Sequence, residues 1–481
     1  MLLSRSLLST SDLLLQSTNG RFLCKRCIQN IKIGIIGSGP AGFYTAQALL
    51  KDERVNIDIY EKYPVPFGLI RFGVAPDHQS VKNVIKSFTN TALNQRVTFY
   101  GNIGVGSDLS LKELRDAYHG IVLCYGASED RKLNIEGEDL INVIPARRFV
   151  GWYNGIPQDA ALKVNLNAES VVIVGHGNVA LDCARILLSP VEEALKSTDI
   201  TEHSLNALRE SKVKTVYIVG RRGPLQVSFT IKELRELTKI PGVDTIVSKS
   251  DFESLSPQII ESLPRPKKRL TEFLVNLAKE QNVHNNFKKC VILFQRSPLK
   301  ILGNKKGEVD SVILGVNELK EEDGLIRALL SGQKEEVRCG LFLRSIGFRA
   351  VSIDKSIPMD DKTGVIKNSN GKIEGVGEGL YCSGWAATGA TGVILGTMNA
   401  SFEIAGHILK DLEANIENLG EKPGSSIIIK SLQEKGVEVV TFQDWQRIDE
   451  LERDIGLKKG KPREKLINQD EMVKVIKDKS L

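Results

Sequence analysis

Residues 32–50 read KIGIIGSGPAGFYTAQALL, and residues 171–188 read VVIVGHGNVALDCARILL. Each stretch is a short apolar run, then a turn with Gly-x-Gly-x-x-Gly or Gly-x-Gly-x-x-Ala spacing, then residues that favour a helix. This order begins a βαβ unit that holds a dinucleotide, because the pyrophosphate binds at the helix N-terminus. The sequence therefore predicts an α/β protein with two Rossmann-like dinucleotide-binding domains, each a mainly parallel sheet flanked by helices.

The first turn, Gly37-Ser-Gly-Pro-Ala-Gly42, carries a glycine at each position where the fingerprint needs one. Gly37 allows the tight turn, Gly39 lets the backbone approach the pyrophosphate, and Gly42 lets the helix pack closely on the strand. A second predicted strand, 56–60, ends in Glu61. An acid there hydrogen-bonds a ribose hydroxyl and suits an adenosine without a 2′-phosphate, so the first unit is expected to hold FAD or NAD.

The second turn, Gly175-His-Gly-Asn-Val-Ala180, precedes a predicted strand at 215–219 that ends in Arg221 and Arg222 rather than an acid. Guanidinium groups match phosphate, so this pair predicts the 2′-phosphate of NADP; alone, it would be read as a solvated surface turn. Two such sites favour a resident FAD and a visiting NADPH, with hydride passing from nicotinamide to flavin.

A chain of 481 residues is too long for one core. We expect a discontinuous FAD domain, 30–129 plus 350–481, with an NADP domain, 130–349, inserted into it. The composition is 41% hydrophobic and 26% charged, and a net charge of +6 gives no reason to expect nucleic acid. No run approaches the roughly 18 apolar residues of a membrane-spanning helix.

Residues 1–29 have a different character. They are rich in serine and leucine, and their charged residues are Arg5, Asp12, Arg21, Lys25 and Arg26. This basic, acid-poor composition predicts a mitochondrial transit peptide. The alternative is a disordered N-terminal segment that carries no targeting signal. Cys24 and Cys27 lie inside it without a second ligand pair, so no zinc site, and no metal elsewhere, is expected.

The electron acceptor is expected to be external. The predicted folded part has no Cys-x-x-Cys for a disulfide reductase and no four-cysteine spacing for an iron–sulfur centre. The basic run Arg265-Pro-Lys-Lys-Arg269 could steer an acidic partner, or simply solubilise a loop. A second basic run, 458–465, is read as a tail.

Several long motifs resemble the adrenodoxin reductase family of mitochondrial NADPH–ferredoxin reductases, from about residue 30 to the end. They are VPFGLIRFGVAPDH at 65–78, GHGNVALD at 175–182, GRRGPLQVSFTIKELR at 220–235, CSGW at 382–385, GATGVI at 389–394 and GKPREKL at 460–466. The small subunit of glutamate synthase shares some of these, but would carry iron–sulfur cysteines. The resemblance implies a glutathione-reductase-like arrangement of the two domains.

The resemblance also implies ligands for each cofactor. Those expected to hold FAD are Gly37, Gly39, Ala41, Gly42, Glu61, Leu69, Val105, Trp385, Gly392, Val393 and Ile394. Those expected to bind NADPH are His176, Gly177, Asn178, Val179, Arg221, Arg222, Glu233 and Gly392. Without the resemblance, Trp385 would be read as a core aromatic and Glu233 as part of a solvated helix face.

His78 and Asp182 match a pair that lies near the flavin in this family. They could relay a proton, or clamp the two domains together by a structural hydrogen bond. Arg265 and Arg269 match the family's docking arginines for an acidic [2Fe–2S] ferredoxin. The implied location is the mitochondrial matrix, with room for peripheral contact with the inner membrane.

Two other functions are compatible with these residues. One is an NADPH-dependent flavoprotein whose acceptor is a small molecule such as a quinone. The other is a redox-sensing protein that binds FAD and NADP without sustained turnover. The first differs from a ferredoxin reductase in its acceptor, and the second in having no steady-state consumption of NADPH.

Overall fold

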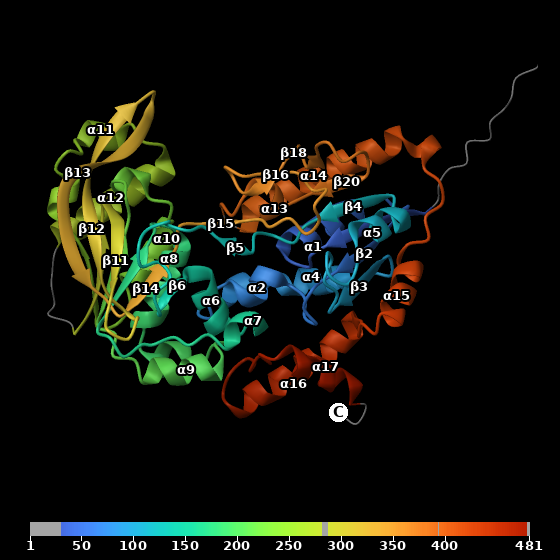
Figure 1. Cartoon of the computed structure of the whole chain (residues 1–481), viewed down its shortest axis with the longest axis horizontal. Coiled ribbons are helices and arrows are strands. Elements are labelled where there is room, and N and C mark those ends of the chain that lie inside the picture. Colours follow the sequence, from blue (N-terminus) through green and yellow to red (C-terminus); the bar gives the residue numbers. More distant parts are fainter. Residues whose placement is uncertain (1–29, 281–286, 393, 479–481) are drawn as a thin grey trace, which may run out of the picture.

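The structure is a computed structural model, and it describes residues 30–280, 287–392 and 394–478. Two lobes stand side by side (Figure 1): the first lobe is built on an eight-stranded sheet, and the second on a six-stranded sheet. The expected transit peptide, with Cys24 and Cys27, lies outside the described residues. No described helix is long and apolar enough to cross a membrane.

The eight-stranded sheet has the order β18-β19-β20-β4-β1-β2-β3-β21. Its five central strands are parallel, and the edge strands β18, β19 and β21 are antiparallel to their neighbours. The strands are β1 Ile31–Ile36, β2 Val55–Tyr60, β3 Val97–Gly101, β4 Gly120–Leu123, β18 Asn368–Ser369, β19 Lys372–Ile373, β20 Leu380–Cys382 and β21 Val440–Thr441. The apolar runs of β1 and β4 are buried on both faces, as a central parallel strand requires.

Helices cover both faces of this sheet (Figure 1). They are α1 Pro40–Leu49, α2 Gly68–Phe72, α3 Gln79–Lys82, α4 Val84–Ala92, α5 Leu111–Ala117, α13 Trp385–Thr388, α14 Ile394–Ala414, α15 Ser425–Glu434, α16 Phe442–Lys458 and α17 Gln469–Lys477. A short hairpin of β16 Met359–Asp360 and β17 Val365–Ile366 packs beside α13. The lobe thus combines the start of the chain with its end.

The second lobe has a fully parallel sheet of order β6-β14-β7-β8-β10-β9. Its strands are β6 Val143–Pro145, β7 Ser170–Val174, β8 Thr215–Val219, β9 Val243–Val247, β10 Lys288–Leu293 and β14 Leu341–Arg344. The helices are α6 Ala146–Asn154, α7 Pro157–Ala160, α8 Asn178–Leu188, α9 Glu202–Arg209, α10 Ile231–Leu237, α11 Pro257–Glu261 and α12 Arg265–Lys279.

Helices flank one face of this second sheet, as predicted, and an antiparallel sheet covers the other face. Val171, Ile173 and Ile218 pack in a core with the helices. The alternate residues, including Val172 and Val219, pack against an antiparallel three-stranded sheet, namely β11 Arg296–Gly303, β12 Val309–Glu322 and β13 Leu325–Arg338. Because both faces of a central parallel strand are apolar, its sequence does not reveal whether a helix or a strand covers it.

The two chain segments that connect the lobes run side by side. β5 Glu129–Asp130 and β15 Phe348–Arg349 form an antiparallel pair. All described strands of the six-stranded and three-stranded sheets fall between these two links. The division into domains at 130 and 349 remains a prediction, and this pairing is compatible with it.

Candidate functional site

The turn between β1 and α1 has three glycines, and a side chain would have room at Gly39 but not at Gly37 or Gly42. A Cβ on Gly37, whose φ is +106°, would lie 2.6 Å from the carbonyl oxygen of Cys124. A Cβ on Gly42 would lie 2.1 Å from the carbonyl oxygen of Gly37, whereas Gly39, the N-cap of α1, has no neighbour within 4 Å of that position. The turn therefore presents bare backbone at the helix N-terminus, where a pyrophosphate fits.

Glu61 lies beside this turn, at the carboxyl end of β2. Its Oε2 accepts hydrogen bonds from the backbone nitrogen of Ser38, at 3.0 Å, and from Ser38 Oγ, at 2.7 Å. Its Oε1 accepts a bond from the backbone nitrogen of Tyr63. The side chain is buried and forms no salt bridge with a described cation, and the carboxylate is held beside the turn where a ribose hydroxyl could reach it.

Segments far apart in the sequence converge on the same turn. A Cβ on Gly68, which precedes Leu69 in α2, would lie 2.9 Å from the Cα of Gly39. A Cβ on Gly384, which precedes Trp385, would lie 2.4 Å from the Cβ of Ala41. The predicted FAD ligands near residues 69 and 385 are thereby brought to the first turn.

The structure does not bring all of the remaining predicted FAD ligands to this turn. Trp385 stacks on Phe348 of the link strand, with ring centroids 6.1 Å apart. Gly392 has φ +82° and no neighbour within 4 Å of a Cβ built on it, and it lies two residues before α14 begins at Ile394. Val105 packs against the core on the other face of the sheet, and Val393 lies outside the described residues.

The second turn repeats the first geometry with one change. Gly175 has φ +129°, and a Cβ there would lie 2.0 Å from the carbonyl oxygen of Ser345. Gly177 is the N-cap of α8 and faces open space, as Gly39 does. The third position carries the methyl group of Ala180, which is fully buried where the first turn has Gly42.

His176 points into the protein rather than out of the turn. Its ring makes an edge-on contact with Phe294 at 4.9 Å, and a Cβ on Gly220 would lie 2.3 Å from its Nδ1. Burial lowers the pKa of His176 to about 4, so the ring is neutral near pH 7. Its carbonyl oxygen accepts bonds from the backbone nitrogens of Ser228 and Phe229, which ties the turn to the next loop.

That loop begins with Arg221 and Arg222, at the carboxyl end of β8. The carbonyl oxygen of Arg221 accepts a bond from Nδ2 of Asn317, and that of Arg222 accepts one from the backbone nitrogen of Gln295. Both side chains are exposed, and neither forms an ion pair with a described carboxylate. The backbone is thus fixed while two guanidinium groups remain free to meet an anion.

The loop continues to α10, whose first turn is held against the second dinucleotide turn. Oδ1 of Asn178 accepts a hydrogen bond from the backbone nitrogen of Thr230. Thr230 caps α10 by accepting a bond from the nitrogen of Glu233. This places Glu233 near the start of α8, close to the predicted NADPH turn.

A cluster of charged groups joins the lobes here. Nε2 of His78 lies 2.7 Å from Oε2 of Glu236 and 3.6 Å from Oε2 of Glu233. Asp182 bonds Arg185, at 2.7 Å, rather than His78. The expected His78–Asp182 pair thus belongs to one cluster, but the two side chains are not hydrogen-bond partners.

Arg185 completes the cluster by also bonding Asp77 of the first lobe, at 2.5 Å. Burial raises the pKa of Asp182 and of Glu233. The ligand atoms of His78, Glu233 and Glu236 lie within 4.8 Å of one another, close enough to hold a metal ion, although the ion pairs already use them. Glu236 and Arg185 were not predicted, since nothing in their local sequence separates them from surface charges.

A second buried ion cluster fastens the end of the chain between the lobes. Asp199 of the second lobe lies 2.6 Å from Nζ of Lys82 and 3.2 Å from Nζ of Lys465. Lys461 is also buried and bonds the carbonyl oxygen of Ile200. The reading of 458–465 as a tail is therefore wrong for Lys461 and Lys465.

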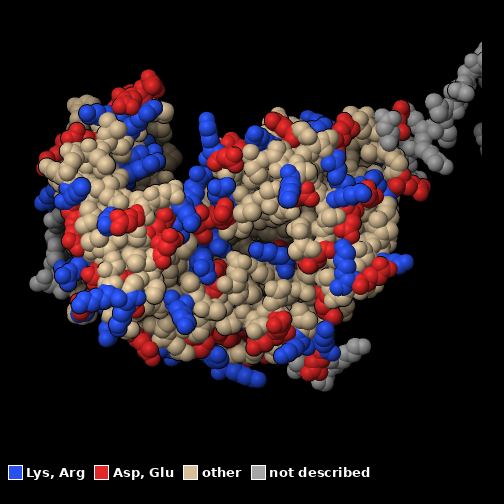
Figure 2. All heavy atoms as spheres, in the orientation of Figure 1, with Lys and Arg blue, Asp and Glu red and all other residues tan. Residues whose placement is uncertain are grey.

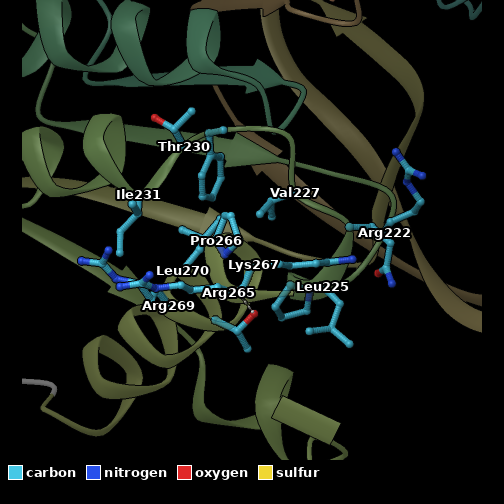
Figure 3. Close-up of a pocket in the computed structure, with 14 residues that line it drawn as sticks. Arg222, Leu225, Val227, Thr230, Ile231, Arg265, Pro266, Lys267, Arg269 and Leu270 are labelled. Carbon is cyan, nitrogen blue, oxygen red and sulfur yellow. Dashed lines mark hydrogen bonds between the residues drawn. The ribbon is translucent and has the colours of Figure 1, made fainter. Parts of the chain in front are cut away.

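A basic pocket of about 690 Å³ lies between the Arg222 loop and α12 (Figure 3). Arg222 lies at one end, Arg265 and Arg269 lie at the other, and Lys267 lies between them. Its walls include the apolar side chains Leu225, Val227, Ile231 and Leu270. The structure therefore joins the predicted NADPH arginine and the predicted docking arginines in one pocket.

Comparison with known proteins gives a consistent result. Residues 31–239 match the family described as pyridine nucleotide-disulphide oxidoreductase. The human protein named "NADPH:adrenodoxin oxidoreductase, mitochondrial" is 49% identical, over 92% of this chain and 92% of its own length. The proteins of that name from Drosophila melanogaster and Arabidopsis thaliana are 47% and 39% identical, over 92% and 94% of this chain and 93% and 97% of their own.

A solved structure agrees with these relatives. "Mycobacterium tuberculosis FprA in complex with NADPH" superposes with a TM-score of 0.89 at 36% sequence identity. The match covers 93% of this chain and 99% of the FprA chain. The α/β fold with mainly parallel sheets is therefore confirmed.

Proposed function

Because the chain belongs to the NADPH:adrenodoxin oxidoreductase family, we infer that it is an FAD-dependent enzyme that takes electrons from NADPH and passes them to an adrenodoxin-type [2Fe–2S] ferredoxin. The relatives' names also support a mitochondrial location. One contrast carries the assignment of the two cofactors. The first dinucleotide turn lies beside Glu61, and the second leads to Arg221 and Arg222.

The first lobe is proposed to hold FAD. When bound, FAD supplies the ability to accept a hydride and to release electrons singly. The backbone around Gly39 and the N-terminus of α1 would bind the pyrophosphate, and Glu61 would accept a hydrogen bond from a ribose hydroxyl. The segments at Leu69 and Trp385, together with Gly392 and Ile394, would close over the ligand.

The second lobe is proposed to bind NADPH. Gly177 and the N-terminus of α8 would receive its pyrophosphate, and Arg221 and Arg222 its 2′-phosphate. Glu233, on α10, would lie near the nicotinamide end. The neutral ring of His176 supports the turn from beneath, which keeps the backbone of 176–179 in place.

The chain's proposed contribution to catalysis is alignment, since two cofactors held by different lobes would have to be fixed relative to each other for a hydride to pass. His78, Asp77, Arg185, Glu233 and Glu236 lie where the lobes meet, so they can fix the distance between the two binding turns. The 2.7 Å bond between His78 and Glu236 supports the clamp over the proton relay, because it spans the lobes without Asp182.

Arg265 and Arg269 are proposed to dock the ferredoxin. Both are exposed and form no ion pair with a described carboxylate. Figure 2 shows an open notch between the lobes with Lys and Arg side chains on its walls. An acidic partner would be steered to such a surface.

The docking claim is tested by the double charge reversal Arg265→Glu with Arg269→Glu. Ferredoxin-dependent reduction of a cytochrome should fall by roughly tenfold or more, because two attractive contacts become repulsive. At saturating NADPH, reduction of ferricyanide should stay within about twofold, since both residues lie at the end of the pocket away from Arg222 and are not proposed to contact the reacting groups. The matched control is Lys305→Glu with Lys306→Glu, an equal charge change on an exposed turn.

The outcomes separate the alternatives. Unchanged ferredoxin-dependent and ferricyanide rates would favour a small-molecule acceptor such as a quinone. Absence of steady-state NADPH consumption, with any acceptor, would favour a redox sensor.

A further inference from the structure

The basic pocket contains several cationic side chains that lie at the N-terminus of a helix, α12. Four of the first five residues of α12 are Arg265, Lys267, Lys268 and Arg269. A helix N-terminus carries partial positive charge, so cations there are unfavourable. Among the described residues, only Lys268 of this run has acidic partners, Glu261 at 2.6 Å and Glu272 at 4.0 Å.

The other end of the pocket adds a further unpaired cation. Arg222 comes from a different element, the loop after β8, and its backbone is held by Gln295. Lys267 lies between Arg222 and the two α12 arginines (Figure 3). One field of positive charge therefore spans the proposed site of the 2′-phosphate and the proposed docking site.

We propose that NADP(H) and the ferredoxin oppose each other at this pocket, so that binding of either one weakens binding of the other. The inference rests on the proposed function, because it takes the roles of Arg222 and of Arg265 and Arg269 from it. A bound 2′-phosphate brings negative charge to one end of the pocket, and an acidic partner brings it to the other. Lys267 attracts both, and the two anions repel each other.

The size of the effect follows from Coulomb's law with screening. Groups carrying one to two charges each, separated near a surface by about one Debye length, which is roughly 10 Å at 0.1 M salt, repel enough to change affinity by about three- to tenfold at low salt. Coupling between two ligands is reciprocal. Docking of the ferredoxin must therefore raise the dissociation constant of the nucleotide by the same factor. Docking would then help to expel the spent nucleotide.

The test uses oxidised holoenzyme and an adrenodoxin-type [2Fe–2S] ferredoxin at about 0.05 M ionic strength, where screening is weak. The dissociation constant of the ferredoxin is measured calorimetrically alone, with saturating 2′,5′-ADP, and with saturating 5′-AMP at matched ionic strength. We expect it to rise about three- to tenfold with 2′,5′-ADP and to stay unchanged with 5′-AMP. The dissociation constant of 2′,5′-ADP should rise by the same factor when ferredoxin is saturating.

The variant Lys267→Gln should weaken both ligands, whereas Lys305→Gln should weaken neither. Equal ferredoxin affinity with and without saturating 2′,5′-ADP would overturn the proposal while leaving the proposed function intact. If Lys267→Gln weakened the binding of only one of the two ligands, 2′,5′-ADP or the ferredoxin, the proposal that both ligands share this pocket would be overturned. A ferredoxin that does not bind at all would instead contradict the proposed function.

Discussion

Nε2 of His78 lies 2.7 Å from Oε2 of Glu236, and this hydrogen bond joins the first lobe to α10 of the second. The bond is half-buried and sits beside Arg185, which bonds Asp77 of the first lobe and Asp182 of its own. Two lobes that each hold one ligand must be fixed relative to each other if a hydride is to pass. The cluster is therefore expected to govern the rate more than the affinity for NADPH.

Replacement of Glu236 tests this expectation. Glu236→Gln removes one charge from the pair, and a charged hydrogen bond contributes about 1.5–3 kcal/mol. Flavin reduction by NADPH in a stopped-flow experiment should slow by about three- to tenfold, with the dissociation constant for NADPH changed by less than about twofold. The control is Glu210→Gln, an exposed glutamate at the end of α9. Full retention of the rate in Glu236→Gln would contradict the clamp.

Asp199 is expected to matter for stability. Although burial alone would raise its pKa, the charges of Lys465 and Lys82 hold it below the usual range. Asp199→Asn leaves two buried lysines without a counter-charge, which should lower the free energy of unfolding by about 3–5 kcal/mol. Urea denaturation measures the change, and Asp361→Asn on the surface is the control. A loss no larger than the control's would show that the cluster carries no stability.

His176 predicts a pH dependence of stability. Its pKa is lowered from 6.5 to about 4 in the folded state, so only the unfolded chain takes up a proton between these values. The contribution of His176 to the free energy of unfolding is fully present above pH 6.5, and it is lost progressively as the pH falls toward 4. Over this pH window, the melting temperature should fall less steeply with decreasing pH in His176→Gln than in the wild type. Equal slopes would mean that the imidazole titrates normally.

Arg222 is expected to set the preference for NADPH over NADH. Arg222→Gln removes a charged hydrogen bond to the 2′-phosphate, worth about 1.5–3 kcal/mol, so KM for NADPH should rise by roughly ten- to a hundredfold. KM for NADH should change by less than about threefold, because NADH lacks that phosphate. Ferricyanide reduction measures both. A parallel rise for the two nucleotides would place Arg222 outside the phosphate site.

The sequence predicted the strand–turn–helix geometry of the two glycine-rich turns well, because local backbone geometry requires their glycines. Gly37 and Gly175 both have positive φ with a carbonyl oxygen behind them, and Gly39 and Gly177 both face open space. The difference between Gly42 and Ala180 also has a local cause, since a Cβ on Gly42 would strike the carbonyl oxygen of Gly37.

Features that depend on distant partners were not predictable in this way. The three-stranded sheet covers an apolar face that a helix could have covered equally well. Lys82, Asp199 and Lys465 come from three separate parts of the chain, and each one alone reads as a surface charge. Glu236 sits on a helix rich in charged residues, and only its contact with His78 distinguishes it. Such pairs require the tertiary fold.

The central claim is that electrons pass from NADPH through a bound flavin to a [2Fe–2S] ferredoxin. Its most direct test is an anaerobic titration of the purified protein with NADPH, followed by addition of oxidised ferredoxin, with visible absorption and electron paramagnetic resonance recorded at each step. We predict a yellow protein whose flavin band bleaches with about one equivalent of NADPH, since hydride transfer carries two electrons. The band should return when ferredoxin is added, as the signal of the reduced iron–sulfur centre appears. A colourless protein, or a bleached band that ferredoxin leaves unchanged, would contradict the account.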